Sequence, residues 1–292
     1  MPPARHGKAG TAMKRLILTA DDYGMSPAVN RAIEECIAAG LVTSTNVMMN
    51  MPFCGDAVLL KKKKISVGLH WVLTCGVPVL LREQIPSLVT QDGCFYSGPE
   101  FRARYRRGLI HNEDIQLELT AQYERFAALF GVPDYWNTHQ DIHVDFCIHV
   151  LFDNTAAGLG MMKMRSHQRV YVPGSCAGSG RSVVWRIAEP VKSCLLDAWQ
   201  REARRKGIAS PEGLVTPLSK EDRMHPEYLF RHIQWGKKQI AEYVIHPATA
   251  CDSPYFGQIA EKRIREYQLF TADATKNVLK DCGIELVSYG VL

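Results

Sequence analysis

Two adjacent aspartates, Asp21 and Asp22, directly follow an apolar run in the segment LILTADDYGMSPAVNRAI, and a helix start follows them. Three histidines come at the ends of other apolar, β-rich runs: His70, His139 and His246. Two imidazoles and one carboxylate form the usual ligand set of a catalytic divalent cation, which keeps coordination positions open for water and substrate. Such a cation would reduce the repulsion between the two carboxylates, so that one can bind the ion while the other takes a proton from water. The residue types therefore predict a metal site with a neighbouring base.

The elements that must position these residues are short β-rich runs that alternate with helical patterns. We expect strands over residues 15–20, 44–49, 65–70, 135–139, 160–165, 241–246 and 284–289. Helices are expected from Ser26 and Pro27 to about Gly40, and over residues 113–130, 144–157, 191–206 and 272–282. This alternation predicts βα units and a mostly parallel sheet, either doubly wound or closed into a barrel. Ligands in such folds bind at the carboxyl ends of the strands. The two aspartates and the three histidines all lie at such ends.

Composition limits the classes of protein that the chain can be. Its 292 residues, 46% of them apolar, suffice for a sizeable core, and no repeat or linker divides residues 14–292. The net charge of +5 is spread along the chain, which gives no reason to expect a nucleic-acid partner. Nine cysteines without a C-x-x-C pair argue against a disulfide framework and favour the cytoplasm. We expect no membrane span, because apolar runs are too short, and a disordered extension over residues 1–13.

Five motifs carry a resemblance to a known family. In chain order they are TADDYGMSPAVNRAI, GLVTSTNVMMN, VGLHWVLTCGVPV, THQDIHV and VIHPA. Together they resemble the YdjC-like carbohydrate deacetylases, which include the chitooligosaccharide deacetylases, from about residue 14 to residue 289. The resemblance implies a single-domain, distorted (β/α) barrel that removes an N-acetyl group from a chito-oligosaccharide or related amino sugar. It also implies one divalent ion, commonly magnesium. Zinc is the alternative that the ligand types leave open.

The resemblance assigns a role to each of the five residues. Asp22, His70 and His139 fall on the metal ligands, and Asp21 falls on the general base. His246 falls where the family has a histidine suited to protonate the leaving amine. That role needs a protonated imidazole near neutral pH, which nearby carboxylates would favour.

Other residues of the same motifs are weaker candidates. Arg165 falls where relatives often carry an arginine, and could orient Asp21, contact substrate or form a structural ion pair. His143 lies four residues after His139, so on a helix it would share its face. It could support a metal ligand, contact substrate or act as a second histidine ligand of the ion. Trp71 could stack on a sugar ring or pack in the core. Relatives usually show aspartate where Asn137 stands, and an amide would orient a ligand imidazole more weakly.

Two other functions compete with deacetylation. The first is a non-catalytic sugar-binding or regulatory protein that keeps the metal site, which the amide of Asn137 makes conceivable. The second is a different metal hydrolase on the same fold, acting on phosphate esters or on another amide. Against it, the sequence has no Gly-rich phosphate loop and no obvious arginine cluster at the strand exits. In each case the expected partner is a small molecule, and a homodimer is left open.

Overall fold

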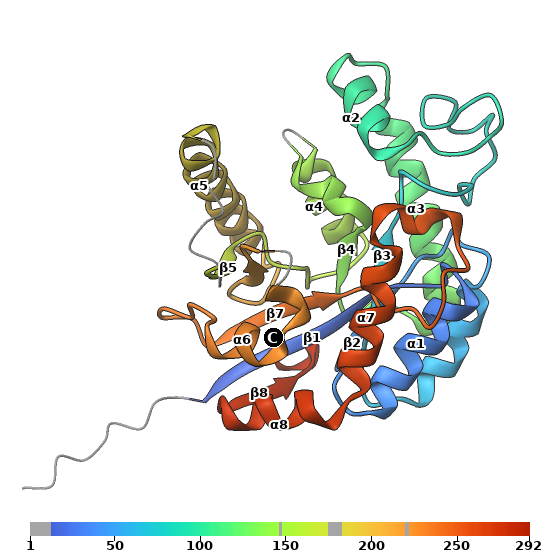
Figure 1. Ribbon diagram of the computed structural model, residues 1–292. Helices are drawn as coiled ribbons and strands as arrows, with labels where there is room; N and C mark the ends of the chain where they lie inside the picture. The colour runs from blue at the N-terminus through green and yellow to red at the C-terminus, as the bar shows by residue number, and fades with distance from the viewer. Residues whose placement is uncertain (1–12, 146–147, 175–182, 220–221) are drawn as a thin grey trace, which may run out of the picture.

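One curled, parallel sheet organises the molecule (Figure 1). The computed structural model describes residues 13–145, 148–174, 183–219 and 222–292, so the expected extension lies outside the described residues apart from Met13. The strands are β1 (Lys14–Tyr23), β2 (Ser44–Val47), β3 (Ser66–Trp71), β4 (Trp136–Thr138), β5 (Arg169–Val172), β6 (Leu214–Pro217), β7 (Ile240–Ile245) and β8 (Ile284–Val287). Their order is β4-β3-β2-β1-β7-β6-β5, with β8 paired to β1. The expected single-domain α/β fold, a distorted and mostly parallel barrel, is confirmed.

The helices lie around this sheet (Figure 1). They are α1 (Pro27–Ala38), α2 (Gly98–Arg106), α3 (Asn112–Phe130), α4 (His149–Gly158), α5 (Val183–Arg205), α6 (Pro226–Arg231), α7 (Ala260–Thr271) and α8 (Asp273–Asp281). The start of α1 follows the sequence pattern, because the Ser26 side chain accepts a hydrogen bond from the Val29 N–H and Pro27 occupies the first turn. Gly131, with φ of 79°, ends α3 as expected. No helix in the described part of the chain is long and apolar enough to cross a membrane.

Strand β1 has neighbours from both ends of the sequence. It pairs with β8 over its first residues, with β2 over its last, and with β7 along most of its length. Its residues Leu16 to Ala20 are fully buried. The carboxyl end of β1 therefore opens at the centre of the sheet edge, flanked by β2 and β7.

One expected strand is only a fragment. Within residues 160–165, Lys163 and Met164 form single parallel bridges, with Ala209 and Trp136 respectively. The Trp136 N–H donates to the Lys163 carbonyl oxygen (3.0 Å), and the Arg165 N–H donates to the Trp136 carbonyl oxygen (3.1 Å). This short pairing extends the sheet beyond β4 and brings Arg165 to the same edge as the other strand ends.

Candidate active site

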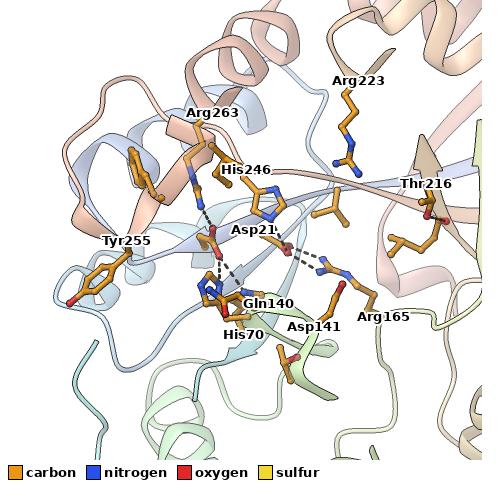
Figure 2. A pocket seen from close by; sticks show the side chains of 18 of the residues that line it. Asp21, His70, Gln140, Asp141, Arg165, Thr216, Arg223, His246, Tyr255 and Arg263 are labelled. Atoms are coloured by element: carbon orange, nitrogen blue, oxygen red, sulfur yellow. Dashed lines mark hydrogen bonds and ion pairs between the residues drawn. The ribbon is translucent and has the colours of Figure 1, made fainter. Parts of the chain in front are cut away.

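A pocket of about 760 Å³ opens at the carboxyl ends of the strands (Figure 2). Six of the residues expected to act in chemistry line it: Asp21, Asp22, His70, His139, Arg165 and His246. They come from β1, from the end of β3, from the residues after β4 and β7, and from the bridge segment beside β4. The parallel sheet thus brings together residues that lie up to 225 positions apart, from Asp21 to His246.

An irregularity in β1 lets both adjacent aspartates face this pocket. In a regular strand, consecutive side chains point to opposite faces. The pairing of β1 with β2 shifts register between Ala20 and Tyr23, and Asp22 has a left-handed φ of 77°. A bulge of this kind re-aims side chains next to active sites. Asn46 of β2 lies opposite the bulge, where its Oδ1 accepts from the Asp22 N–H (3.2 Å) and its Nδ2 donates to Asp21 Oδ1 (2.6 Å).

Asp22, His70 and His139 form a cluster that could hold a metal ion. Asp22 Oδ1 lies 3.3 Å from His70 Nε2 and 3.2 Å from His139 Nδ1, and the three ligand atoms lie within 4.8 Å of one another. All three residues are buried. One carboxylate oxygen and two imidazole nitrogens suit a divalent cation and leave coordination positions toward the pocket. The residues present therefore fit the ion that the sequence leads us to expect.

The second oxygen of Asp22 is held by an arginine. Nη2 of Arg263, on α7, donates to Asp22 Oδ2 at 2.5 Å, and the guanidinium packs over the Phe256 ring. Burial of Asp22 acts to raise its pKa, but the charge of Arg263 and the imidazole of His139 outweigh burial and hold that pKa well below its usual range. Asp22 is thus kept ionised, with Oδ1 left to the imidazoles.

Asp21 is held by a different set of donors. Arg165 forms two hydrogen bonds with it, Nη1 to Oδ2 (2.8 Å) and Nη2 to Oδ1 (2.7 Å). Burial acts to raise the pKa of Asp21, but the Arg165 guanidinium outweighs it and lowers that pKa to about 2. Behind Arg165, Glu242 of β7 accepts from its Nη2 (3.1 Å) and also accepts from the Tyr289 hydroxyl (2.8 Å). Of the roles considered for Arg165, the structure therefore gives it contacts with Asp21 and a buried ion pair.

His246 lies on the other side of Asp21. Its Nε2 is 3.9 Å from Asp21 Oδ2, and the pocket leaves 27% of its side chain exposed. Its backbone N–H donates to Glu266 of α7 (2.8 Å), which fixes the loop after β7. Burial lowers the pKa of His246, although Asp22 and Asp21 act in the opposite direction. The carboxylates thus favour the protonated imidazole, as expected, but burial outweighs them and the pKa of His246 is lowered.

Two expected substrate contacts lie in the core instead. Trp71 is 1% exposed, packs against Trp136 and Phe152, and donates from Nε1 to the Leu119 carbonyl oxygen (2.9 Å). A ring that is enclosed on all sides cannot stack on a sugar, so the core alternative holds for Trp71.

His143 is likewise buried, at 2% exposure, with Nδ1 2.6 Å from the Thr138 hydroxyl. The helix that would align it with His139 is interrupted, because Gln140 and Asp141 have left-handed φ of 57° and 52°. His143 lies outside both the pocket lining and the metal cluster. The structure thus places His143 in neither the pocket nor the metal cluster, but against Thr138, the residue before His139.

The pocket contains an arginine cluster that the sequence did not reveal. Besides Arg165 and Arg263, it is lined by Arg169 of β5 and by Arg223. Within the described residues, the side chains of Arg169 and Arg223 have no hydrogen bond or ion pair. The sequence shows no obvious arginine cluster at the strand exits, and the fold instead gathers these arginines from separate elements.

Sequence reasoning also missed residues that support the site. Glu242 carried a signal, because it is a charged residue inside a mainly apolar strand. Asn46 carried little, because its strand, STNV, is itself mostly polar. Arg263 carried none, since it lies in a helix rich in charged residues. Asp252, to which the sequence assigned no role, accepts a hydrogen bond from the Ala28 N–H at the start of α1 (2.8 Å).

Comparisons with known proteins agree with this architecture. The chain is 38% identical to a chitooligosaccharide deacetylase of Proteus mirabilis over 94% of its length and 97% of the relative. It is 29% identical to a carbohydrate deacetylase of Brevibacillus brevis over 95% of its length and 99% of the relative. A crystal structure from Enterococcus faecalis, of a protein with a proposed role in cellobiose-phosphate cleavage, has the same fold. That structure matches with a TM-score of 0.74 and 22% identity, and covers 96% of this chain and 99% of that one.

The family assignment rests on a match to nearly the whole chain. The model of the YdjC-like protein family matches residues 15–281, a range that includes the bulge of β1, both imidazoles of the metal cluster and His246. The chain therefore belongs to the YdjC-like protein family.

Proposed function

We propose that this protein is a metal-dependent hydrolase that removes N-acetyl groups from chito-oligosaccharides or related amino sugars. The observation that carries the proposal is the meeting of Asp22, His70 and His139 in one pocket beside Asp21. Relatives named carbohydrate deacetylase and chitooligosaccharide deacetylase support the substrate class. The described cysteines are free, which fits action in the cytoplasm.

In this proposal, Asp22 Oδ1, His70 Nε2 and His139 Nδ1 hold one divalent cation. When bound, a cation at this position supplies a Lewis acid that polarises an acetamide carbonyl and lowers the pKa of a water molecule. Family resemblance favours magnesium, whereas two imidazole ligands are more typical of zinc. Arg263 holds Asp22 Oδ2, so that only one oxygen of this carboxylate is available to the ion.

Asp21 acts as the general base and takes a proton from the attacking water. The water oxygen forms a bond to the acetamide carbon, the C–N bond breaks, and the products are a free amine and acetic acid, which releases its proton to solvent and becomes acetate. Arg165 and Asn46 fix the Asp21 carboxylate by three hydrogen bonds, which orients it for this transfer.

His246 delivers a proton to the departing nitrogen. Because its pKa is lowered, the imidazole is neutral before the reaction begins and must acquire that proton during the cycle. Asp21, whose Oδ2 lies 3.9 Å from Nε2, gains a proton from the attacking water in the preceding step. The proton taken from water thus passes from Asp21 through His246 to the amine, and both side chains return to their starting states.

Two substitutions test the proposal separately. His70→Ala should abolish both metal binding, measured by calorimetry, and acetate release from N-acetylated chito-oligosaccharides. Asp21→Asn should retain metal binding but lower kcat by about 10²- to 10⁴-fold, because only the base is removed. His111→Ala is the control for both measurements, because it makes the same change at an exposed histidine.

The outcomes separate the competing functions. An unaffected His70→Ala variant would rule out the metal-dependent deacetylase. Tight binding of chito-oligosaccharides by the unmodified protein without acetate release would instead favour the sugar-binding alternative. A panel that includes phosphorylated substrates tests the phosphate-ester reaction.

A further inference from the structure

We infer that Asn137 opposes metal loading, because its amide selects the form of the His70 imidazole that cannot bind a cation through Nε2. The inference rests on the proposed function, in that it takes Asp22, His70 and His139 as the metal site. Beyond that function, the inference makes Asn137 a residue that sets the metal affinity of the site. It also links this affinity to the hydrogen bonds that hold Asp21.

Asn137 lies at the point where the two halves of the site meet. It is fully buried in β4, beside His70 of β3. One end of its carboxamide is 2.7 Å from His70 Nδ1. The other end lies 3.0 Å from Asn46 Nδ2, 2.8 Å from Arg165 Nη1 and 2.7 Å from Arg165 Nη2. The amide thus touches a metal ligand on one side and both groups that hold Asp21 on the other.

The partners determine which way the amide points. The three nitrogens of Asn46 and Arg165 can only donate hydrogen bonds, so the amide oxygen must face them. The amide NH₂ then faces His70 Nδ1 and donates to it. Nδ1 must therefore carry a lone pair, which places the proton of the neutral imidazole on Nε2. That proton points at Asp22 Oδ1, 3.3 Å away, where the cation would have to bind.

Metal binding must reverse this arrangement at a cost. Coordination by Nε2 requires the proton on Nδ1, where it would meet the Asn137 NH₂. Turning the amide through 180° would relieve that contact, but it would place the NH₂ against three other donors and weaken the hold of Arg165 on Asp21. A carboxylate at this position would accept hydrogen bonds on both sides and avoid the conflict altogether.

Calorimetric titration with Zn²⁺ and with Mg²⁺ tests the inference on the full chain without substrate. Asn137→Asp should bind metal about tenfold more tightly than the unmodified protein, or better. Asn137→Ala, which removes the opposing amide, should bind metal no more weakly than the unmodified protein. Gln140→Glu is the charge control, because Gln140 lines the same pocket, so this variant measures the gain from added negative charge alone.

Thermal unfolding shows whether Asn137→Asp and Asn137→Ala are folded. If only one of them folds, its metal affinity alone tests the inference. The inference is overturned if Asn137→Asp gains no more affinity than Gln140→Glu. It is equally overturned if Asn137→Ala loses affinity, since that loss would mean the amide positions His70 for the metal. A His70→Ala variant that binds metal normally would instead remove the proposed metal site, which is a different failure.

Discussion

At the scale of single residues, the site gives different environments to two neighbours in the sequence. Asp21 and Asp22 are chemically identical and adjacent, yet Arg165 holds one and Arg263 the other. Only Asp22 also faces the two imidazoles of the metal cluster. Such differences in surroundings allow two neighbouring carboxylates to take different chemical roles.

The state of His139 predicts how metal affinity depends on pH. Burial acts to lower its pKa, but neighbouring Cys75 and Asp22 outweigh burial and raise the pKa to about 9. Below that pH, the imidazole is protonated and a cation must displace the proton. We expect Zn²⁺ affinity to fall about tenfold for each pH unit below about 9, with one proton released by this residue.

Calorimetry in two buffers that differ in ionisation enthalpy measures both quantities. At pH values above the pKa of His139, the affinity should level off, because no proton is left to displace. An affinity that stays constant from about pH 6.5 to about pH 8.5 would contradict the prediction.

The residues that sequence reasoning placed correctly all follow one physical rule. Parallel strands end at the same edge, so polar residues after apolar runs must meet there, as Asp21, His70 and His246 do. The sequence could not decide the exposure of Trp71 and His143, because it depends on their neighbours in space, which come from α3, α4 and the bridge region. Arg263 was missed for the same reason, since its contact with Asp22 spans 241 positions.

At the scale of elements, helix α7 holds both sides of the pocket. It supplies Arg263 to Asp22 and Glu266 to the His246 N–H. The Arg263 carbonyl oxygen also accepts from the Ala248 N–H (3.2 Å), which ties down the loop after β7. This helix lies beside α1, whose start follows the aspartate bulge (Figure 1). Displacement of α7 would therefore disturb the metal cluster and His246 together.

Removal of the Arg263 charge should destabilise the metal-free protein. Arg263→Gln leaves the buried Asp22 carboxylate without its cation, which costs about 3–5 kcal/mol of unfolding free energy. Added Zn²⁺ should restore much of that loss, because it supplies positive charge to the same carboxylate.

Denaturant unfolding with and without Zn²⁺ measures both effects. Arg205→Gln is the matched control, since its ion pair with Glu202 is exposed and worth at most about 1 kcal/mol. Equal stabilities of Arg263→Gln and the unmodified protein without metal would show that the ion pair with Asp22 contributes little.

Element boundaries were harder to anticipate than element types. The pattern of residues 144–157 predicted one helix, but α4 begins only at His149, after a 3₁₀ turn with two left-handed residues. Nothing in local propensity requires that turn. Its backbone carbonyl at Gln140 accepts from Arg102 of α2 (2.8 Å), so tertiary contacts hold it in place.

At the scale of the whole molecule, a buried hydrogen-bonded chain connects the end of the sequence to the proposed base. The Tyr289 hydroxyl donates to Glu242, Glu242 accepts from Arg165, and Arg165 holds Asp21. The Tyr289 ring also stacks on Tyr135, with ring centroids 3.8 Å apart. The position of Asp21 therefore depends on residues after β8.

Tyr289→Phe tests this dependence because it removes only the hydroxyl. The buried Glu242 carboxylate loses a donor, so we expect the unfolding free energy to fall by about 1–3 kcal/mol, together with a lower kcat and unchanged metal affinity. Tyr243→Phe is the matched control, since the buried Tyr243 hydroxyl has no hydrogen-bond partner in the described structure. If both variants behave alike in stability and kcat, the connection to Asp21 is refuted.

The placement of β1 affects how partial genes should be interpreted. All three proposed metal ligands lie within the first 139 residues, so a truncated reading frame that stops there would still contain each of them. Such a fragment would lack β7 and β8, which flank β1 in the sheet. Surveys that assign activity from the ligand motifs alone would therefore count products that cannot assemble the scaffold.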